Sequence, residues 1–431
     1  MLKRKIENQL ISWKNNSNRM PLIVKGARQV GKTFTIENFA KKNYKNYIYI
    51  NFEEMPEYKT IFDGNLDIGT LTKQMTLRIK NINLAANETV IFFDEIQSCP
   101  QAITALKFFA IDKRFDIIAS GSLLGINYKE VSSFPVGYVE HLEMHSLDFE
   151  EYLWAIGISQ SSICDIKKYF DERKALPGGM HEQMMKYFKE YIVVGGMPRV
   201  VREFTETQNF ANVLKLQKAI VKDYLNDISK YATGTEKTKV RACFLSVPKQ
   251  LAKDYKKFQY SVVEKGSTSK KFAGSLMWLY DAGIINFCHN LAKPELPLEG
   301  NSIDGEFKVY MRDTGLLMSM LEDGSQTDVI DGNLGIYKGA IYENIIADIF
   351  TKTDKKLYYF ERKSKIEVDF FIRFQKIATA IDVKSADNTK SKSAVNIIKN
   401  YGVQKAIKLS AKNLRNSDKI DHIPLYMAMF L

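Results

Sequence analysis

Cysteine and histidine are scarce, with four cysteines and five histidines among 431 residues. The cysteines lie far apart and outside any CxxC or Cys/His pattern: Cys99, Cys164, Cys243 and Cys288. A disulfide framework and a structural zinc site are therefore not expected, and a cytoplasmic location fits this composition. The chain also lacks a run of about 18 apolar residues, so we expect no membrane span. Its first residues lack the apolar core of a signal peptide.

Acidic residues are outnumbered by basic ones. The chain has 50 Asp and Glu against 62 Lys and Arg, a formal net charge of +12. This excess favours nucleic acid, most simply DNA, or another polyanion as a partner. The length predicts roughly two to four domains.

The most informative stretch is Gly26 to Thr33, which spells GxxxxGKT, the phosphate-binding loop (P-loop). Residues 22–24 predict a buried strand before it, and residues 33–40 predict a helix after it. A phosphate site needs this order, because loop amides and a helix N-terminus must converge on one anion. The predicted nucleotide-contacting residues of this stretch are Gly26, Ala27, Arg28, Gln29, Val30, Gly31, Lys32, Thr33 and Phe34.

Two side chains of this loop have predicted chemical roles. Lys32 would place its ammonium on the β- and γ-phosphates, and the Thr33 hydroxyl would be a ligand of Mg²⁺. An ordinary glycine-rich turn is the alternative, but the flanking strand and helix disfavour it. The sequence therefore predicts binding of a nucleoside triphosphate.

A second motif follows about 60 residues later, where an apolar run ends in two acids, Asp94 and Glu95. A strand buried on both faces would deliver these carboxylates at its C-terminal edge, beside the P-loop. In this Walker B interpretation Asp94 is a Mg²⁺ ligand and Glu95 activates the attacking water. The alternative is that the two acids only cap the next helix.

The next buried strand is predicted at 115–119 and ends in Ser120-Gly121-Ser122. A polar side chain here could reach the γ-phosphate or the attacking water as a sensor. Ser120 is the residue we assign to the nucleotide site, with Ser122 as the other possibility. Ser-Gly-Ser is also a common turn, so both interpretations stay open.

Together these motifs make the chain resemble one group of prokaryotic AAA-type ATPases. The resemblance continues through the stretches 147–151, 195–198, 227–231, 313–317, 338–340 and 343–344. In that group the ATPase core is joined to a C-terminal domain of unknown function with a restriction-endonuclease-like fold. The resemblance implies ATP and Mg²⁺ as cofactors and self-assembly into a homo-oligomer.

The same resemblance leaves the arginine finger unassigned. The group often has a basic residue after the glycine of Phe-Pro-Val-Gly, but this chain has Tyr138. Arg199 and Arg241 are the remaining candidates, and each could equally be an ordinary surface arginine.

The expected fold class is α/β, in four parts. Residues 1–155 would form the AAA-type core with a parallel sheet, and 156–233 a helical lid. Residues 234–328 would form a winged helix, and 329–431 the restriction-endonuclease-like domain with a PD-(D/E)xK-like plan.

The predicted winged helix has helices at 236–246, 248–254 and 267–280, followed by strands at 284–291 and 307–311. Residues 236–271 contain ten Lys and Arg against three Asp and Glu. Five lysines gather on and before the predicted recognition helix: Lys256, Lys257, Lys265, Lys270 and Lys271. They predict phosphate contact, although a solvated lysine face or a protein-docking module would look similar.

The last hundred residues place a helical acid, Glu343, before two acids on predicted strands, Asp369 and Asp382. The resemblance implies that these three bind Mg²⁺ for phosphodiester hydrolysis, with Glu367 as a substitute ligand. Lys384 would stabilise the developing charge beside Asp382. The predicted catalytic residues of the whole chain are thus Lys32, Glu95, Asp382 and Lys384.

The favoured function is ATP binding and hydrolysis, acting on or regulated by nucleic acid, with a Mg²⁺-dependent nuclease at the C-terminus. The alternative is a nucleotide-gated regulatory switch whose C-terminal domain binds DNA or protein without cleaving it. A third interpretation, an ATP-driven remodeller of a protein partner, has no support beyond the fold.

Overall fold

The computed structural model describes residues 2–121, 135–232, 234–253, 256–333, 338–362, 366–384, 392–417 and 419–431. The chain divides into two compact units. The N-terminal unit is Arg4–Ser146, and the C-terminal unit is Leu147–Leu431 together with the first residues of the chain. Within the described ranges, no helix is both long and apolar enough to span a membrane.

Outside residues 122–134, which the structure does not describe, the N-terminal unit has five strands and four α-helices. The strands are β1 (Leu22–Lys25), β2 (Asn46–Asn51), β3 (Thr89–Asp94), β4 (Asp116–Gly121) and β5 (Glu140–Glu143). The helices are α1 (Ile6–Asn15), α2 (Lys32–Asn43), α3 (Ile68–Arg78) and α4 (Pro100–Asp112), with 3₁₀ turns at Pro56–Phe62 and Ile96–Ser98.

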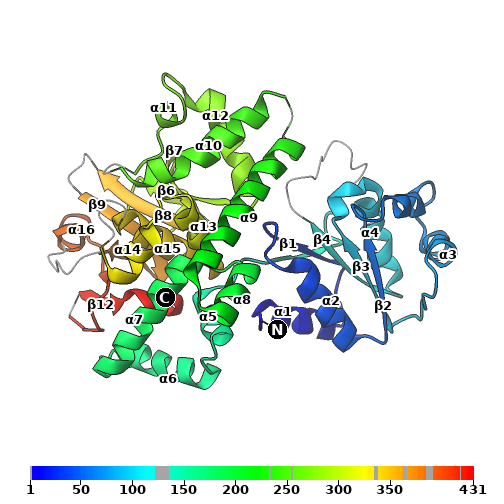
Figure 1. The fold of residues 1–431 in the computed structure, drawn as a ribbon, viewed down its shortest axis with the longest axis horizontal. Helices are drawn as coiled ribbons and strands as arrows, with labels where there is room; N and C mark the ends of the chain where they lie inside the picture. Colours follow the sequence, from blue (N-terminus) through cyan, green and yellow to red (C-terminus); the bar gives the residue numbers. More distant parts are fainter. Residues whose placement is uncertain are drawn as a thin grey trace. The chain divides into compact units, whose positions relative to one another are not determined.

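The strands form one parallel sheet in the order β2-β3-β4-β1-β5. Helices α3 and α4 cover one face through a shared apolar core, and α2 packs on the other face with α1 behind it (Figure 1). All six residues of β3 are buried, as expected for a central strand covered on both faces. Because the strands are parallel, the carboxyl ends of β1, β3 and β4 lie at one edge of the sheet.

The first part of the C-terminal unit is helical. Its helices are α5 (Phe149–Ala155), α6 (Gln160–Asp171), α7 (Gly178–Val194), α8 (Pro198–Thr207) and α9 (Phe210–Tyr231). Helix α5 starts at a capping box, in which Asp148 and Glu151 each accept the other's backbone N–H. The predicted absence of strands from 156 to 232 is confirmed for the described residues of this stretch.

The rest of this unit is mixed. Its helices are α10 (Glu236–Leu251), α11 (Tyr260–Val263), α12 (Ser269–Asp281), α13 (Thr314–Ser319), α14 (Ser325–Asp331), α15 (Lys338–Lys352) and α16 (Lys392–Tyr401). Its strands are β6 (Ile285–Leu291), β7 (Ser302–Met311), β8 (Leu357–Arg362), β9 (Ile366–Phe374), β10 (Ile377–Val383), β11 (Lys405–Ser410) and β12 (Ile420–Pro424). Short 3₁₀ turns lie at Glu299–Asn301 and Leu425–Phe430.

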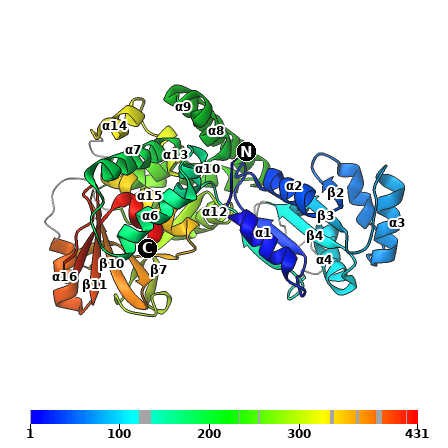
Figure 2. The same cartoon turned by 90° about the horizontal axis from the view of Figure 1, so that it is seen from below.

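These seven strands form one mixed sheet in the order β12-β11-β10-β9-β8-β6-β7. Helix α16 packs against β9, β10 and β11, and α15 packs against β7, β8 and β10 (Figure 2). The helix predicted to carry Glu343 and the strands predicted to carry Asp369 and Asp382 are therefore present, as α15, β9 and β10.

The structure differs from the prediction for the stretch 234–328 in two respects. Pro248 was expected to separate two helices, but α10 is continuous and contains it. The buried neighbours Val247 and Leu251 hold this turn in place, and Ala252 N–H still bonds the Pro248 carbonyl at 3.0 Å. Tertiary packing has outweighed the cost of an interior proline.

The second change concerns the predicted wing. Strands β6 and β7 are antiparallel neighbours, as a wing requires, but β6 also pairs in parallel with β8. They are thus the edge of the large sheet, and the predicted divisions at 156, 234 and 329 fall within one compact unit.

Candidate functional site

The P-loop joins β1 to α2 through a backbone that needs its glycines. Gly26 has φ of 154°, and a Cβ there would lie 2.1 Å from the Met144 carbonyl oxygen. Gly31, with φ of 93°, turns the chain into α2. The first bond of this helix runs from Thr35 N–H to the Gly31 carbonyl at 3.0 Å. The three amides before it thus open the helix without an intrahelical partner, which is the arrangement that phosphate binding uses.

The Lys32 side chain extends back to the start of this loop. Its Nζ donates to the carbonyl oxygens of Gly26, at 2.9 Å, and Ala27, at 2.8 Å. Burial lowers the pKa of this ammonium to about 8, although Glu95 and Asp94 partly offset the effect. A buried cation held by neutral carbonyls is placed to exchange them for anionic phosphate oxygens.

The carboxylate of Asp94, at the end of β3, accepts hydrogen bonds from three side-chain hydroxyls. Its Oδ2 accepts from Thr33 Oγ1 at 2.8 Å and from Tyr49 at 3.0 Å, and its Oδ1 accepts from Ser120 Oγ. Mg²⁺ in nucleotide sites keeps waters and binds one or two protein groups plus phosphate oxygens. Thr33 and Asp94 fit that role. Ser120 lies beside them, and its assignment as a sensor stays a prediction.

Glu95 follows directly in a left-handed conformation, with φ of 51°. Such a φ is unusual for a residue other than glycine and re-aims the side chain relative to the strand. Its carboxylate accepts from Gln97 Nε2 at 2.5 Å. Burial raises the pKa of Glu95, and neighbouring Asp94 adds to the increase. A carboxylate with a raised pKa suits proton abstraction from water.

The other predicted loop residues support the loop or face outward. Arg28 lies 3.7 Å from Glu53, and the Phe34 side chain is 58% exposed. The Val30 carbonyl accepts from Arg4 Nη1 at 3.0 Å. Ser122 lies outside the described residues.

Sequence reasoning missed Tyr49, Asn51, Gln97 and Arg4. Asn51 ends β2, and its Nδ2 lies 3.0 Å from the Tyr49 hydroxyl and 3.5 Å from Asp94 Oδ2. The position of Asn51 near the end of the alternating apolar stretch 47–52 was an available signal, because the carboxyl end of β2 adjoins the P-loop edge. Arg4 offered no comparable signal, since its role depends on how residues before α1 fold back.

A second group of charged side chains lies in the C-terminal unit, where the predicted nuclease residues are. Glu343 comes from α15, Asp369 from β9 and Asp382 from β10, and all three are buried. Lys384 Nζ lies 2.6 Å from Asp382 Oδ1, and Asp369 Oδ2 accepts from Val383 N–H at 2.7 Å. Burial, together with Glu343 and Asp382, raises the pKa of Asp369 to about 8.

Two further lysines enter this group. Lys256 Nζ bonds Glu343 Oε1, and Lys308 Nζ, from β7, lies 2.8 Å from Glu367 Oε1 and 3.8 Å from Glu343 Oε2. Burial opposes ionisation of Glu343, but Lys256 and Lys308 outweigh it and lower the pKa of this carboxyl. No three acidic, histidine or cysteine side chains in the described part of the chain are placed to hold a metal ion. The metal-ligand assignment of Glu343, Asp369 and Asp382 stays a prediction.

The lysines predicted to contact DNA divide into two kinds. Lys256, Lys257 and Lys271 form ion pairs with Glu343, Glu306 and Glu264, respectively. Lys265 and Lys270 are exposed. Only part of the predicted basic face is thus presented to solvent as positive charge.

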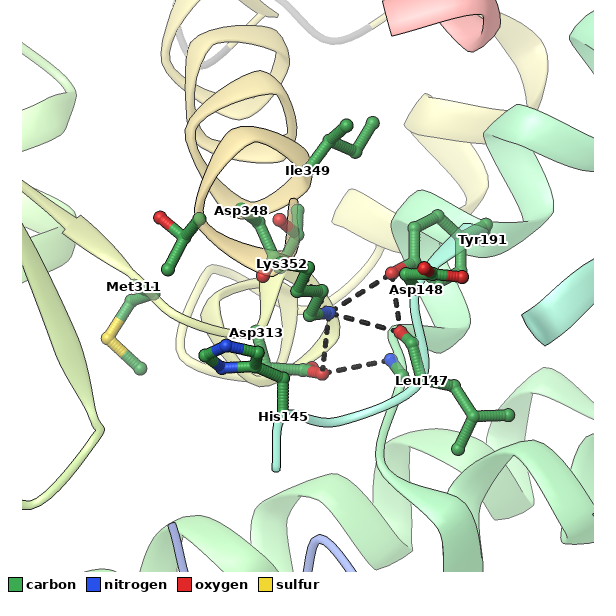
Figure 3. A network of polar contacts seen from close by, with 12 residues as sticks. His145, Leu147, Asp148, Tyr191, Met311, Asp313, Asp348, Ile349 and Lys352 are labelled. Atoms are coloured by element: carbon green, nitrogen blue, oxygen red, sulfur yellow. Dashed lines mark hydrogen bonds and ion pairs between the residues drawn. The ribbon is translucent and has the colours of Figure 1, made fainter. Parts of the chain in front are cut away.

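A third buried network centres on Lys352 of α15 (Figure 3). Its Nζ lies 3.0 Å from Asp348 Oδ2, 3.1 Å from the Leu147 carbonyl and 3.1 Å from the Tyr191 hydroxyl. The two charged side chains are only 2% and 1% exposed. Burial raises the pKa of Asp348 to about 7, and nearby Asp313 adds to the increase.

The network reaches the backbone through Asp313, whose Oδ2 accepts from Gly196 N–H at 2.9 Å. Leu147 N–H in turn donates to the Gly196 carbonyl at 2.7 Å. A Cβ on Gly196 would lie 2.1 Å from the Leu147 carbonyl oxygen, so only glycine fits here. Leu147 is therefore held at its carbonyl by the buried Lys352 ammonium and at its N–H by the Gly196 carbonyl.

Comparison with known proteins gives the class of the N-terminal unit. Residues 18–153 match the AAA domain model, so the predicted AAA-type, P-loop domain is confirmed. Residues 185–327 and 338–427 match two domains of unknown function, DUF8612 and DUF4143. The winged helix and the restriction-endonuclease-like domain stay predictions. No curated protein matches the chain significantly.

Solved structures give weaker likenesses. A Walker-type ATPase of Pyrococcus abyssi is 14% identical with a TM-score of 0.45, over 74% of this chain and 96% of that one. The Aeropyrum pernix ORC1 protein, solved in complex with DNA, is 11% identical with a TM-score of 0.30, over 76% and 90%. The Thermotoga maritima RuvB branch-migration motor is 14% identical with a TM-score of 0.30, over 66% and 89%. At these values the likenesses carry no functional information.

Proposed function

We propose that the AAA domain binds ATP together with Mg²⁺ and hydrolyses it. The observation that carries this proposal is the pairing of two features at one sheet edge. Lys32 is buried on neutral loop carbonyls, and the Thr33 hydroxyl bonds Asp94 beside it. An ammonium and a hydroxyl–carboxylate pair side by side suit the phosphates of ATP and a Mg²⁺ ion, respectively.

In this proposal each residue of the nucleotide site has a distinct role. The first amides of α2 and the Lys32 ammonium hold the β- and γ-phosphates, and Thr33 and Asp94 would hold Mg²⁺, which neutralises phosphate charge when bound. Glu95 orients a water and accepts its proton as the water oxygen attacks the γ-phosphorus. The bond from the γ-phosphorus to the bridging oxygen breaks, and ADP and phosphate leave.

The test is steady-state phosphate release from ATP by the full chain and by Lys32→Ala. Loss of one charge-stabilising donor lowers rates by about 10²–10³ in comparable sites, and a loss of that order is expected here. Lys41→Ala is the matched control, because Lys41 lies on the same helix but is exposed beside Glu37. Equal rates for both variants and the unmodified chain would overturn the proposal.

The wider role that we propose is a cytoplasmic, self-assembling ATPase whose nucleotide state controls contact with nucleic acid, most simply DNA. The net charge of +12 and the exposed Lys265 and Lys270 support a polyanionic partner. Mg²⁺-dependent cleavage by Asp382 and Lys384 is the finer prediction. It is tested by incubating DNA with Mg²⁺, with and without ATP, and comparing Lys384→Ala.

The second candidate is a nucleotide-gated switch that binds DNA or protein without cleaving it. Ion pairing of Glu343 with Lys256 and Lys308 favours this candidate, because paired carboxylates are poor metal ligands. DNA-independent hydrolysis with a nucleotide-dependent change of oligomer would support the switch. DNA-stimulated hydrolysis accompanied by cleavage would reject it.

A further inference from the structure

The charged group around Glu343 contains cations of its own. We infer that Lys256 and Lys308 are the resident cations of this centre, in place of a divalent metal, and that it ties the C-terminal unit together without cleaving phosphodiesters. This inference is independent of ATP hydrolysis and would hold with an inactive AAA domain.

The first argument is that the chain's own donors already engage both oxygens of Glu343. Lys256 Nζ bonds Oε1, and the Tyr310 hydroxyl donates to Oε2 at 3.1 Å. Lys308 Nζ lies 3.8 Å from the same Oε2. A magnesium ion needs ligand oxygens at about 2.1 Å in octahedral geometry. A magnesium ion bound to Glu343 would have to share both carboxylate oxygens with these donors.

The second argument is the position of Lys308. Its side chain is 1% exposed, and its ammonium pairs with Glu367 at 2.8 Å while facing Glu343. A divalent ion beside this fixed ammonium would be repelled at short range with little screening.

The third argument is that Lys256 is anchored. Next to it, Lys257 pairs with Glu306 at 2.9 Å. One residue further, Phe258 N–H donates to the Phe307 carbonyl at 2.8 Å, and the two rings stack at 5.8 Å. The segment 256–258 thus runs beside β7 and delivers Lys256 to Glu343 from outside the sheet.

The remaining two acids are also engaged. Asp369 Oδ2 accepts from Val383 N–H, and Asp382 Oδ1 pairs with Lys384. Four lysines therefore face four carboxylates: Lys256, Lys308, Lys384 and Lys408 against Glu343, Glu367, Asp369 and Asp382. The charges come close to balance without any added ion.

A metal centre and a lysine-neutralised centre respond oppositely to loss of an acid. Carboxylates gathered for a metal repel one another when the metal is absent, so removing one raises the melting temperature, and adding the metal raises it too. Where lysines neutralise the acids, removing an acid leaves a buried ammonium unpaired and lowers the melting temperature. Added metal then has no effect.

The experiment uses the full chain with Thr33→Ala and Asp94→Asn, so that the P-loop cannot bind metal. Its melting temperature is measured with and without Mn²⁺ and no nucleotide, before and after Glu343→Gln. We expect Glu343→Gln to lower the melting temperature by several degrees and Mn²⁺ to leave it unchanged. The matched control is Glu299→Gln, because Glu299 pairs with Lys356 at an exposed site, and it should have almost no effect.

A rise in melting temperature with Mn²⁺ that disappears in Glu343→Gln would overturn the inference. So would Mn²⁺- or Mg²⁺-dependent DNA cleavage that is lost in Lys384→Ala. If Glu343→Gln does not fold, Mn²⁺ titration of the parent chain by electron paramagnetic resonance decides. Absence of a bound ion supports the inference, and one ion bound per chain rejects it.

Discussion

Two buried lysines of this protein, Lys32 and Lys308, stand in opposite environments. Lys32 in the N-terminal unit rests on two neutral carbonyl oxygens, and burial lowers its pKa to about 8. Lys308 in the C-terminal unit faces carboxylates, which raise its pKa against the effect of burial. The first ammonium lacks an anionic partner within its own loop, whereas the second has anionic partners in the fold.

This difference separates a binding site from a structural one. A buried charge without a counter-charge costs stability, and a ligand of opposite charge recovers it. A buried charge that the chain itself neutralises gains nothing from a ligand. We therefore propose that a bound phosphate stabilises the P-loop, whereas the centre around Glu343 needs no added ion.

The largest expected effect is on the chemical step of the N-terminal site. Glu95→Gln keeps the shape of the side chain but cannot take a proton, so ATP hydrolysis should fall by about 10²–10⁴. Nucleotide binding, followed with a fluorescent analogue, should persist. Glu57→Gln, at an exposed position of the same unit, is the control. A rate within threefold of the unmodified chain would remove Glu95 from the mechanism.

The next effect compares the two lysines directly. Lys308→Met removes the buried ammonium that pairs with Glu367 and faces Glu343, and should cost about 3–5 kcal/mol of stability. Lys32→Met removes an ammonium that bonds neutral carbonyls and whose burial Glu95 and Asp94 offset only partly, so stability without nucleotide should fall much less. Differential scanning calorimetry of the nucleotide-free proteins measures both. Similar destabilisation by the two substitutions would break the comparison.

A third effect depends on pH through Asp348. Its pKa in the folded protein, about 7, lies above the unfolded value of about 3.9, so the folded state holds the extra proton between these values. Stability contributed by this carboxyl is therefore present at low pH and is lost as pH rises towards 7. The maximum slope is about 1.4 kcal/mol per pH unit.

Asp348→Asn should flatten this part of the stability profile, measured by calorimetry from pH 4.5 to 7.5. Asp313 and Lys352 are the charged side chains that face the Asp348 carboxyl. Asp165→Asn, at an exposed site on α6, is the control for the general effect of removing one negative charge. An unchanged slope in Asp348→Asn would show that Asp348 does not titrate in this range.

The smallest expected effect concerns DNA. Lys270 is exposed, whereas Lys257 pairs with Glu306. If the C-terminal unit contacts phosphates, Lys270→Ala should reduce the slope of log affinity against log salt by about 0.9, and Lys257→Ala should change it less. Fluorescence anisotropy over a salt series measures both slopes. Equal slopes for all three proteins would indicate that this face does not bind DNA.

Much of the nucleotide site could be predicted from the sequence, because its parts are short and contiguous. Gly26 and Gly31 satisfy local backbone requirements, and Asp94 ends an apolar strand whose neighbours in the sheet follow from parallel topology. The partners of Asp94 on β2 were not foreseen. Tyr49 and Asn51 read as ordinary strand residues until the sheet brings them beside β3.

Only part of the charged group around Glu343 could be predicted from the sequence. Its acids and Lys384 could be located by their pattern on one helix and two strands. Lys256 and Lys308 could not, because they lie outside that pattern and come from a segment and a strand that were assigned to another domain. The predicted division at 329 also separates β6 from β8, which pair in the structure.

The sequence by itself determined the P-loop, the order of helices and strands, and the positions of the predicted catalytic residues, because these depend on local backbone freedom and on the spacing of apolar residues. Only the tertiary structure decided which charges meet. Ion pairing depends on the approach of segments far apart in the chain. It distinguishes Lys32, which bonds neutral carbonyl oxygens, from Lys308, which pairs with carboxylates.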